Sequence, residues 1–256
     1  MKSKINLLKP LSFLLSICFL LLIWELVSRK IGLDFIFPGI SLTFQRFSVL
    51  VKSKEFYISI SLSVLRIFLG FVFGVVSGVI LAFVCNLVPF ISMTVSHLMT
   101  VIKSTPVASF IMILWVMIGS AKLPTVIALL MVMPIIWQNL TDGYKSINQN
   151  LQEVTVIYEL GFFKRQKLLV IPTLMNYLIP AMLTSIGLAW KSGIAAEILT
   201  YTKNSIGKNI HDAKAYFEGP DLLCWTITVI FISLIFEYSI KFLIERFKNG
   251  ASHIER

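Results

Sequence analysis

Long apolar runs alternate with short polar segments along most of the chain. Six of these runs carry few charged residues and come close to, or exceed, the roughly 20 residues that a helix needs to cross a bilayer. They cover residues 10–27, 58–87, 91–118, 123–140, 172–199 and 222–244. The pattern therefore predicts an all-α polytopic membrane protein with six transmembrane helices.

The segments around these runs divide the chain into three regions. Residues 1–57 comprise an N-terminal tail, the first transmembrane helix and an amphipathic segment that follows a break at Pro38-Gly39. Residues 58–245 are expected to form a core of five transmembrane helices, and residues 246–256 a C-terminal tail. No small-x-small cleavage site follows the first run, so we interpret it as a retained helix rather than a signal peptide.

Composition and charge agree with a membrane protein. Hydrophobic residues make up 57% of the chain and charged residues 14%, which is outside the range of soluble domains. The net charge of +10 is spread over tails and loops, so we expect no nucleic-acid partner. Lys and Arg are slightly more frequent on the side of the two termini, which favours a cytoplasmic position for that side. Cys18, Cys85 and Cys224 lie far apart and indicate packing residues rather than a disulfide or metal site.

Two features inside the runs concern helix packing. Gly70, Gly74 and Gly78 recur at every fourth residue and therefore form one stripe, where a second membrane helix can approach closely. Pro106 interrupts the third run and weakens the hydrogen bonding of that helix, which predicts a bend or a stretch of backbone exposed to a cavity.

Ionisable side chains inside the runs are candidates for a polar transport path. A charge at the bilayer centre costs about 2.5–3.5 kcal/mol on insertion scales, so such residues rarely face lipid. Lys103, Lys191 and Glu197, together with Trp190, are our candidates for the wall of the path. Arg66 lies nearer the end of its run. The alternative is that these charges snorkel or form a structural ion pair within the bundle.

Residues 153–172 form the longest polar, helix-compatible segment between apolar runs. Glu153, Val154, Ile157, Leu160 and Gly161 are spaced nearly as the residues on one face of a helix are. The cations Lys164, Arg165 and Lys167 follow them, and cations are favourable at the C-terminal end of a helix. We predict a short amphipathic helix over about 153–165 that contacts a soluble partner. Pro172 is suited to the first turn of the next helix.

This segment resembles the EAA loop of ABC-importer permeases, which reads Glu-Ala-Ala, three residues, Gly, nine residues, Ile, one residue, Leu, Pro. Aligned without a gap, Glu153 takes the place of the Glu, Val154 and Thr155 those of the two Ala, Glu159 that of the Gly, and Leu169, Ile171 and Pro172 those of the Ile, Leu and Pro. The resemblance implies that the segment couples transport to an ATPase. The residues that we assign to this coupling are Glu153, Val154, Thr155, Tyr158, Glu159 and Gly161.

Further stretches follow the order of one family. Residues 61–70 (SLSVLRIFLG), 103–108 (KSTPVA), 115–122 (WVMIGSAK) and 187–197 (GLAWKSGIAAE), with Ser205-Ile-Gly207 after them, are similar to permeases of the nitrate, sulfonate, taurine and bicarbonate importer class. The similarity implies a type I ABC importer permease fold in a bacterial plasma (inner) membrane, with both termini in the cytoplasm. It also implies a homodimer, two copies of an ATP-binding subunit that hydrolyses ATP with Mg, and an extracytoplasmic substrate-binding protein.

Motifs of catalysis are missing from the sequence. It contains no G-x-x-x-x-G-K-[ST] phosphate loop, no H-E-x-x-H and no G-x-S-x-G, so we expect no catalytic residues, no metal site and no cofactor bound by this chain. We expect the solute to be small, and Lys103 and Lys191 would suit an organic or inorganic anion. The alternative function is a stand-alone secondary transporter or channel, which would predict an inverted repeat that we do not find.

Overall fold

A computed structural model describes residues 2–252, with side chains at position 12 and at positions 14–242. This range contains helices and no strand. The helices are α1 (Lys2–Ile31), α2 (Ile40–Leu50), α3 (Lys54–Leu87), α4 (Pro89–Ser104), α5 (Val107–Ile118), α6 (Leu123–Lys145), α7 (Gln149–Ile157), α8 (Phe162–Arg165), the π-helix η1 (Gln166–Val170), α9 (Ile171–Thr200), α10 (Ile206–Ala215) and α11 (Gly219–Ser252). The last four residues of the predicted C-terminal tail, 253–256, lie outside the described residues.

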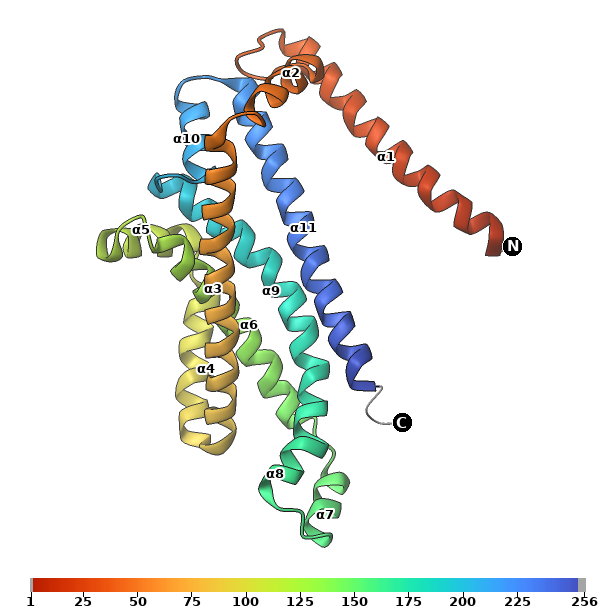
Figure 1. Ribbon diagram of the computed structural model, residues 1–256. Coiled ribbons are helices and arrows are strands. Elements are labelled where there is room, and N and C mark those ends of the chain that lie inside the picture. Colours follow the sequence, from red (N-terminus) through yellow and green to blue (C-terminus); the bar gives the residue numbers. More distant parts are fainter. Residues whose placement is uncertain (1, 253–256) are drawn as a thin grey trace.

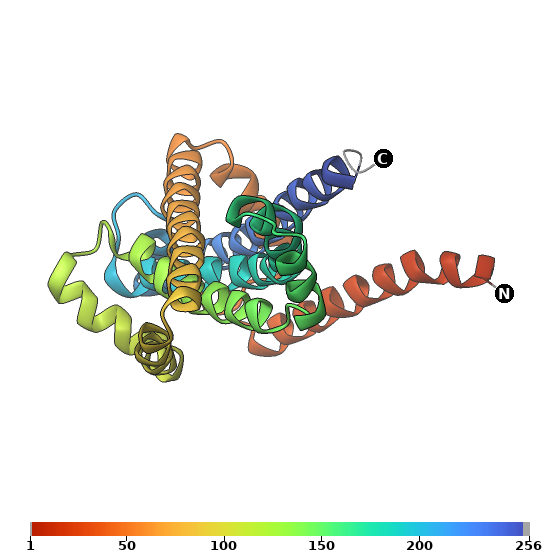
Figure 2. The same ribbon diagram turned by 90° about the horizontal axis from the view of Figure 1, so that it is seen from below.

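The long helices run between two ends of the molecule. The short helices α2 and α10 lie at one end, which we call the α10 end, and α7 and α8 lie at the other, which we call the α7 end (Figure 1). Seen along the bundle, α1 and α5 project from it in different directions (Figure 2). Helices α3, α6 and α9 pack against one another and form the centre.

Within the described residues, four helices are long and apolar enough to cross a membrane, and α4 with α5 makes a fifth if the pair counts as one broken span. The four are Lys54–Leu87, Leu123–Lys145, Phe162–Thr200 and Gly219–Phe242. Helix α1 covers the first predicted run, 10–27. The all-helical class and the membrane class are therefore confirmed, whereas the predicted number of six spans is not established.

The third predicted run, 91–118, is not one continuous helix. Helices α4 and α5 meet at an angle of 102°. Thr105 has an extended backbone with φ −79° and ψ 129°, as expected for a residue whose helical conformation is disfavoured by the following proline. Pro106 in turn has no N–H to donate to the preceding turn. The proline therefore ends the helix instead of bending it slightly.

The glycine stripe of α3 is confirmed as a contact surface with α6. Gly70, Gly74 and Gly78 are buried, and a Cβ atom at Gly74 would lie 2.6 Å from the Cβ of Val132. At Gly70 an added Cβ would lie 2.4 Å from the backbone oxygen of Thr125. No methyl group fits at these distances, so glycine is required for the two helices to approach this closely.

The α10 end is held together by polar contacts between distant segments. The predicted break at Pro38-Gly39 is confirmed, since α2 begins at Ile40. Two nitrogen atoms of Arg46 donate to the two carboxylate oxygens of Asp221 at the start of α11. This hydrogen bonding raises the pKa of Arg46 above its ordinary value. The thiol of Cys224 donates to the backbone oxygen of Thr43 at 3.3 Å, which confirms that Cys224 is a packing residue.

Two glycine-to-alanine substitutions test the role of the stripe. Both gain about 1 kcal/mol in helix propensity, but Gly74→Ala meets Val132, whereas nothing lies within 4 Å of a Cβ at Gly187 in α9. We expect Gly74→Ala to lower the thermal unfolding temperature of the purified chain in detergent, and Gly187→Ala to leave it unchanged or raise it slightly. Equal unfolding temperatures for both variants would contradict the close contact between α3 and α6.

Candidate functional site

The segment predicted as one helix over 153–165 consists of two helices. Helix α7 starts earlier than predicted and ends at Ile157, and the four-residue helix α8 starts at Phe162. The π-helix η1 then leads directly into α9, with Pro172 in its first turn as predicted. The single-helix prediction is wrong because the chain reverses at Tyr158 to Gly161, where the residue in the glycine position of the EAA pattern adopts a left-handed conformation.

That residue is Glu159, with a φ of 48°. The N–H of Leu160 donates to the oxygen of Thr155 at 2.9 Å, and the N–H of Glu159 donates to that of Val156 at 3.0 Å. These two bonds form a Schellman motif, in which a left-handed residue usually occupied by glycine closes a helix. Gly161 has a φ of −58° and does not replace it. The turn after α7 thus has the shape that a glycine would allow, with a glutamate in its place.

Most of the residues assigned to coupling lie on the surface of α7 and the turn. Glu153, Val154, Tyr158, Glu159 and Gly161 are exposed. Thr155 is the exception, because it is 7% exposed and its hydroxyl donates to the oxygen of Gln152 at 2.6 Å. Thr155 therefore supports the turn from inside and does not offer a contact surface.

A groove of about 560 Å³ lies between α7 and α8. It is lined by Gln149, Gln152, Glu153, Val156, Ile157 and Arg165. Arg165 Nη2 donates to Gln152 Oε1 at 3.3 Å and joins the two helices. Around the groove, Ile157 is 76% exposed and Phe163 84% exposed. Exposed apolar side chains beside a groove with polar walls are typical of a surface that binds another protein.

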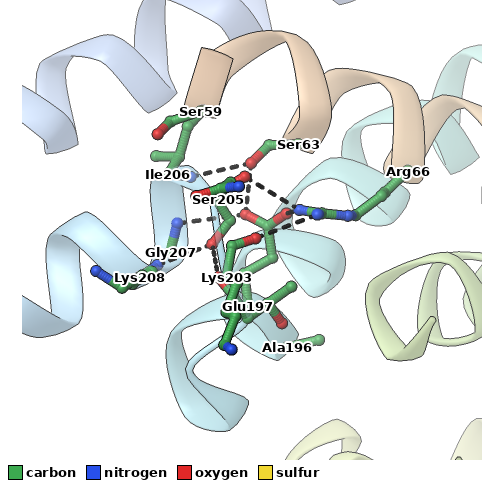
Figure 3. A network of polar contacts seen from close by, with 12 residues as sticks. Ser59, Ser63, Arg66, Ala196, Glu197, Lys203, Ser205, Ile206, Gly207 and Lys208 are labelled. Atoms are coloured by element: carbon green, nitrogen blue, oxygen red, sulfur yellow. Dashed lines mark hydrogen bonds and ion pairs between the residues drawn. The ribbon is translucent and has the colours of Figure 1, made fainter. Parts of the chain in front are cut away.

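A cluster of polar side chains, which we call the Glu197 cluster, lies at the α10 end. Glu197 itself is fully buried. Its Oε2 atom accepts hydrogen bonds from the Ser63 hydroxyl at 2.7 Å and from the N–H of Gly207 at 3.2 Å. Figure 3 shows the carboxylate between these two donors, which come from α3 and from the start of α10. A Cβ at Gly207 would lie 2.3 Å from the Cβ of Glu197, so only glycine lets α10 begin this close to α9.

Arg66 completes the cluster from α3. Its Nη1 lies 3.6 Å from Glu197 Oε1, and the guanidinium also donates to the backbone oxygens of Lys203 and Asn204 at 3.2 and 3.3 Å. A buried carboxylate is stable only with such partners. Arg66 and Glu197 thus form an ion pair within the bundle, as the alternative interpretation of these charges predicted.

Helix α10 is also held by charges on its own surface. Lys208 Nζ donates to Asp212 at 2.8 Å, and the hydroxyl of Tyr201 donates to the same carboxylate at 2.7 Å. Burial raises the pKa of Asp212, but these two hydrogen bonds outweigh it and leave the pKa below its ordinary value. The hydrogen bond to Asp212 raises the pKa of Lys208. Both groups therefore stay charged near neutral pH and tie α10 to the end of α9.

The four candidates for the transport path lie in different surroundings. Trp190 is 1% exposed and donates to the oxygen of Val229 at 3.2 Å, so it packs inside the subunit between α9 and α11, as Glu197 packs near α10. Lys191 is exposed. Lys103 is also exposed and borders a cavity of about 240 Å³ at the break between α4 and α5, opposite Leu188 of α9. In this conformation only the two lysines are open to solute, and a role in the path stays a prediction for all four.

Sequence reasoning did not identify the partners of Glu197 or of Asp221. Ser63 and Gly207 are ordinary residues in their segments, and no spacing rule brings them to α9. An arginine and a glutamate in apolar runs do signal a pair, because neither is stable alone in a membrane. From that signal the pairing of Arg66 with Glu197 could have been predicted. The neutral donors, Ser63 and Gly207, could not.

Comparison with known proteins adds an independent finding. Residues 57–250 match the protein family described as "Binding-protein-dependent transport system inner membrane component". The match begins within α3 and continues into α11, so it covers more than half of the chain. It includes the groove between α7 and α8 and the residues around Glu197. A comparison with curated proteins gives no significant match.

The turn after α7 can be tested with a pair of glycine variants. Glu159→Gly should remove the cost of a left-handed side-chain residue, about 1 kcal/mol, and should slow the hydrogen exchange of the Leu160 amide about fivefold. Gly161→Ala is the control, because the residue has a negative φ and nothing lies within 4 Å of its Cβ; its effect should be small. Faster exchange in Glu159→Gly would contradict the Schellman geometry.

The Glu197 cluster can be tested by thermal unfolding in detergent. Glu197→Ala leaves the buried donors of Ser63 and Gly207 without their acceptor, at about 1–3 kcal/mol each, and removes the ion-pair partner of Arg66. The variant should therefore unfold at a clearly lower temperature. Glu197→Gln, which keeps an acceptor oxygen, should lie between it and the wild type. Lys191→Ala in the same helix removes an exposed side chain and should not change the unfolding temperature. A wild-type value for Glu197→Ala would show that the cluster does not stabilise the fold.

Proposed function

The chain belongs to the binding-protein-dependent transport system inner membrane component family and is thus a membrane permease component of an ABC transporter, and from this premise we propose that it serves an ATP-driven importer. It would pass a small solute from an extracytoplasmic binding protein to the cytoplasm. In this family the ATPase is a separate subunit. We propose that two ATPase copies and a second copy of this chain complete the transporter in a bacterial inner membrane, with both termini and the α7 end in the cytoplasm.

The observation that carries the proposal is the exposed surface of α7 and α8. It combines apolar side chains, such as Ile157 and Phe163, with the acidic Glu153 and a groove wide enough for side chains of a partner. An ATPase subunit bound there would bury this surface.

The connection from this surface to the spans supports a coupling role. Arg165 ties α8 to α7, and η1 joins α8 to α9 without a loop. Helix α9 then continues for 30 residues to the Glu197 cluster at the opposite end. A movement of the ATPase against α7 would therefore be passed to α9 as the tilt of a rigid helix.

The break between α4 and α5 supports a path beside Lys103. Irregular backbone at membrane depth is tolerated only where it is buried in protein or lines a polar cavity, and Thr105 and Lys103 both border the cavity at this break. Lys191 lies one turn beyond Leu188, which borders the same cavity. The positive charges of Lys103 at this cavity and of the exposed Lys191 in the next turn of α9 would suit an organic or inorganic anion as the solute.

Exposed apolar residues on the projecting helices support a second copy of the chain. Val116 of α5 is 88% exposed and Met117 is 73% exposed. A homodimer in which α5 packs against the partner would cover both.

Co-purification tests the proposed assembly. We expect an ATP-binding protein to elute with the gently solubilised chain in equal amount, because one ATPase copy would bind each α7 surface. Isolation of the chain alone, with solute transport in liposomes that lack ATP, would contradict the importer proposal and favour a secondary transporter.

A charge reversal tests the role of the α7 surface. Glu153→Lys should leave the amount of chain in the membrane unchanged but reduce the recovered ATPase subunit and abolish ATP-dependent uptake, because it inverts the charge in the docking groove. Asp34→Lys is the matched control, since Asp34 is exposed at the α10 end and its reversal should not change ATPase recovery. Normal uptake by Glu153→Lys would rule out this docking role.

A further inference from the structure

A cavity at the α7 end is separate from the groove between α7 and α8. Its volume is about 350 Å³, and it lies between the turn that joins α3 to α4 and the last residues of α6. Its apolar wall consists of Ala82, Cys85, Pro89 and Met93, and its polar wall of Asn86, Ser92, Thr141, Tyr144 and Lys145. This volume is in the range of small-ligand sites.

The polar wall is rich in groups that are free to donate. Among the residues whose side chains are described, those of Asn86, Ser92, Tyr144 and Lys145 form no hydrogen bond or ion pair with the protein. The hydroxyl of Thr141 donates to the oxygen of Trp137 at 2.8 Å. Four unused donors around one cavity contrast with the Glu197 cluster, in which each donor has found an acceptor.

The electrostatics of this cavity favour an anion. Its lining includes Lys145 and no carboxylate. The neighbouring Asp142 does not line the cavity, and both of its oxygens accept from Gln138 Nε2 at 3.1 Å. Pro89 begins α4, a helix of 16 residues, whose first N–H groups add partial positive charge to this side.

The depth of the cavity places it at the boundary of the membrane. Helix α3 ends at Leu87 and α6 at Lys145, both beside the cavity. On α4, Phe90 is 79% exposed and Met93 is 69% exposed, so an apolar surface continues from the opening of the cavity along the span. A charged group in the cavity can therefore be attached to an acyl chain that lies against α4.

We propose that this cavity binds a phosphate group, with Lys145 as its counter-ion and Asn86, Ser92 and Tyr144 as neutral donors. Two sources carry this chemistry at a membrane boundary, namely the headgroup of an anionic phospholipid and free inorganic phosphate. Basic pockets between helices at the cytoplasmic side of a membrane are typical sites for anionic headgroups. A zwitterionic headgroup fits less well, because its ammonium group finds no carboxylate in the lining. The inference rests on the proposed orientation, with the α7 end in the cytoplasm, but its test requires neither an ATPase subunit nor import.

The test uses the purified full chain in detergent, without any partner subunit. Dihexanoyl phosphatidylglycerol, dihexanoyl phosphatidylcholine and inorganic phosphate are each titrated, and binding is followed by the rise in thermal unfolding temperature. We expect phosphatidylglycerol to bind, and Lys145→Gln to weaken its apparent affinity about tenfold, the usual effect of losing a charge-assisted hydrogen bond. Lys167→Gln is the control, because Lys167 is exposed near the same end and lies outside the cavity; it should bind as the wild type does.

The three ligands separate the possible sources. Binding of phosphatidylglycerol alone, dependent on Lys145, assigns the site to a lipid headgroup, whereas Lys145-dependent binding of inorganic phosphate with equal affinity assigns it to the free anion. A double variant, Asn86→Ala with Ser92→Ala, keeps the charge and should weaken binding as well. The proposal is overturned if phosphatidylcholine binds as tightly as phosphatidylglycerol, or if Lys167→Gln weakens binding as much as Lys145→Gln does.

Discussion

The close approach of α3 to α6 is the contact on which the rest of the structure depends. In lipid there is no hydrophobic force between helices, so association relies on packing of the helix surfaces themselves. The stripe of Gly70, Gly74 and Gly78 lets the backbone of α6 lie against α3, and Gly193 of α9 accepts the side chain of Ile67 in the same way, at 2.6 Å from an added Cβ. The central helices are therefore joined at small residues, and the contact between α3 and α9 brings Ser63 to Glu197.

The two ends of this core are built differently. At the α10 end, Arg66, Ser63 and Gly207 surround a buried carboxylate and connect three helices. At the α7 end, hydrogen bonds within a turn hold α7, and its apolar residues are exposed. The first arrangement resists movement, because separating the helices would leave a charge unpaired. The second is open to a partner, and α9 connects the two.

Side chains that form no hydrogen bond within a membrane protein indicate a candidate binding site when they surround a cavity. In a cavity at the boundary of a bilayer, a donor such as Ser92 that has no partner within the protein is available to a lipid headgroup, as we propose for the cavity beside Lys145. The cavity beside Lys145 and the surface of α7 are close in the fold but differ in chemistry. One offers donors and a positive charge, the other apolar side chains and a carboxylate, so they suit different ligands.

The membrane class, most of the long apolar helices and the function of the glycine stripe could be predicted from the amino-acid sequence. These follow from local rules, since burial in lipid requires apolar residues at nearly every position of a span, and close helix contact requires small ones at every fourth. The resemblance around Glu153 likewise located the candidate coupling segment and led to the family that residues 57–250 match.

The roles of the polar residues, in contrast, became clear from the packing of the helices. Glu197 and Lys191 lie in the same helix and have equal claims to a transport path, yet one is fully buried against Ser63 and Arg66 while the other is exposed. The break at Pro106 and the left-handed Glu159 were likewise visible only as possibilities, because a proline can bend a helix or end it and a glutamate rarely replaces a turn glycine. A side chain's partners come from segments distant in the chain, and their approach is set by helix packing that no local pattern records.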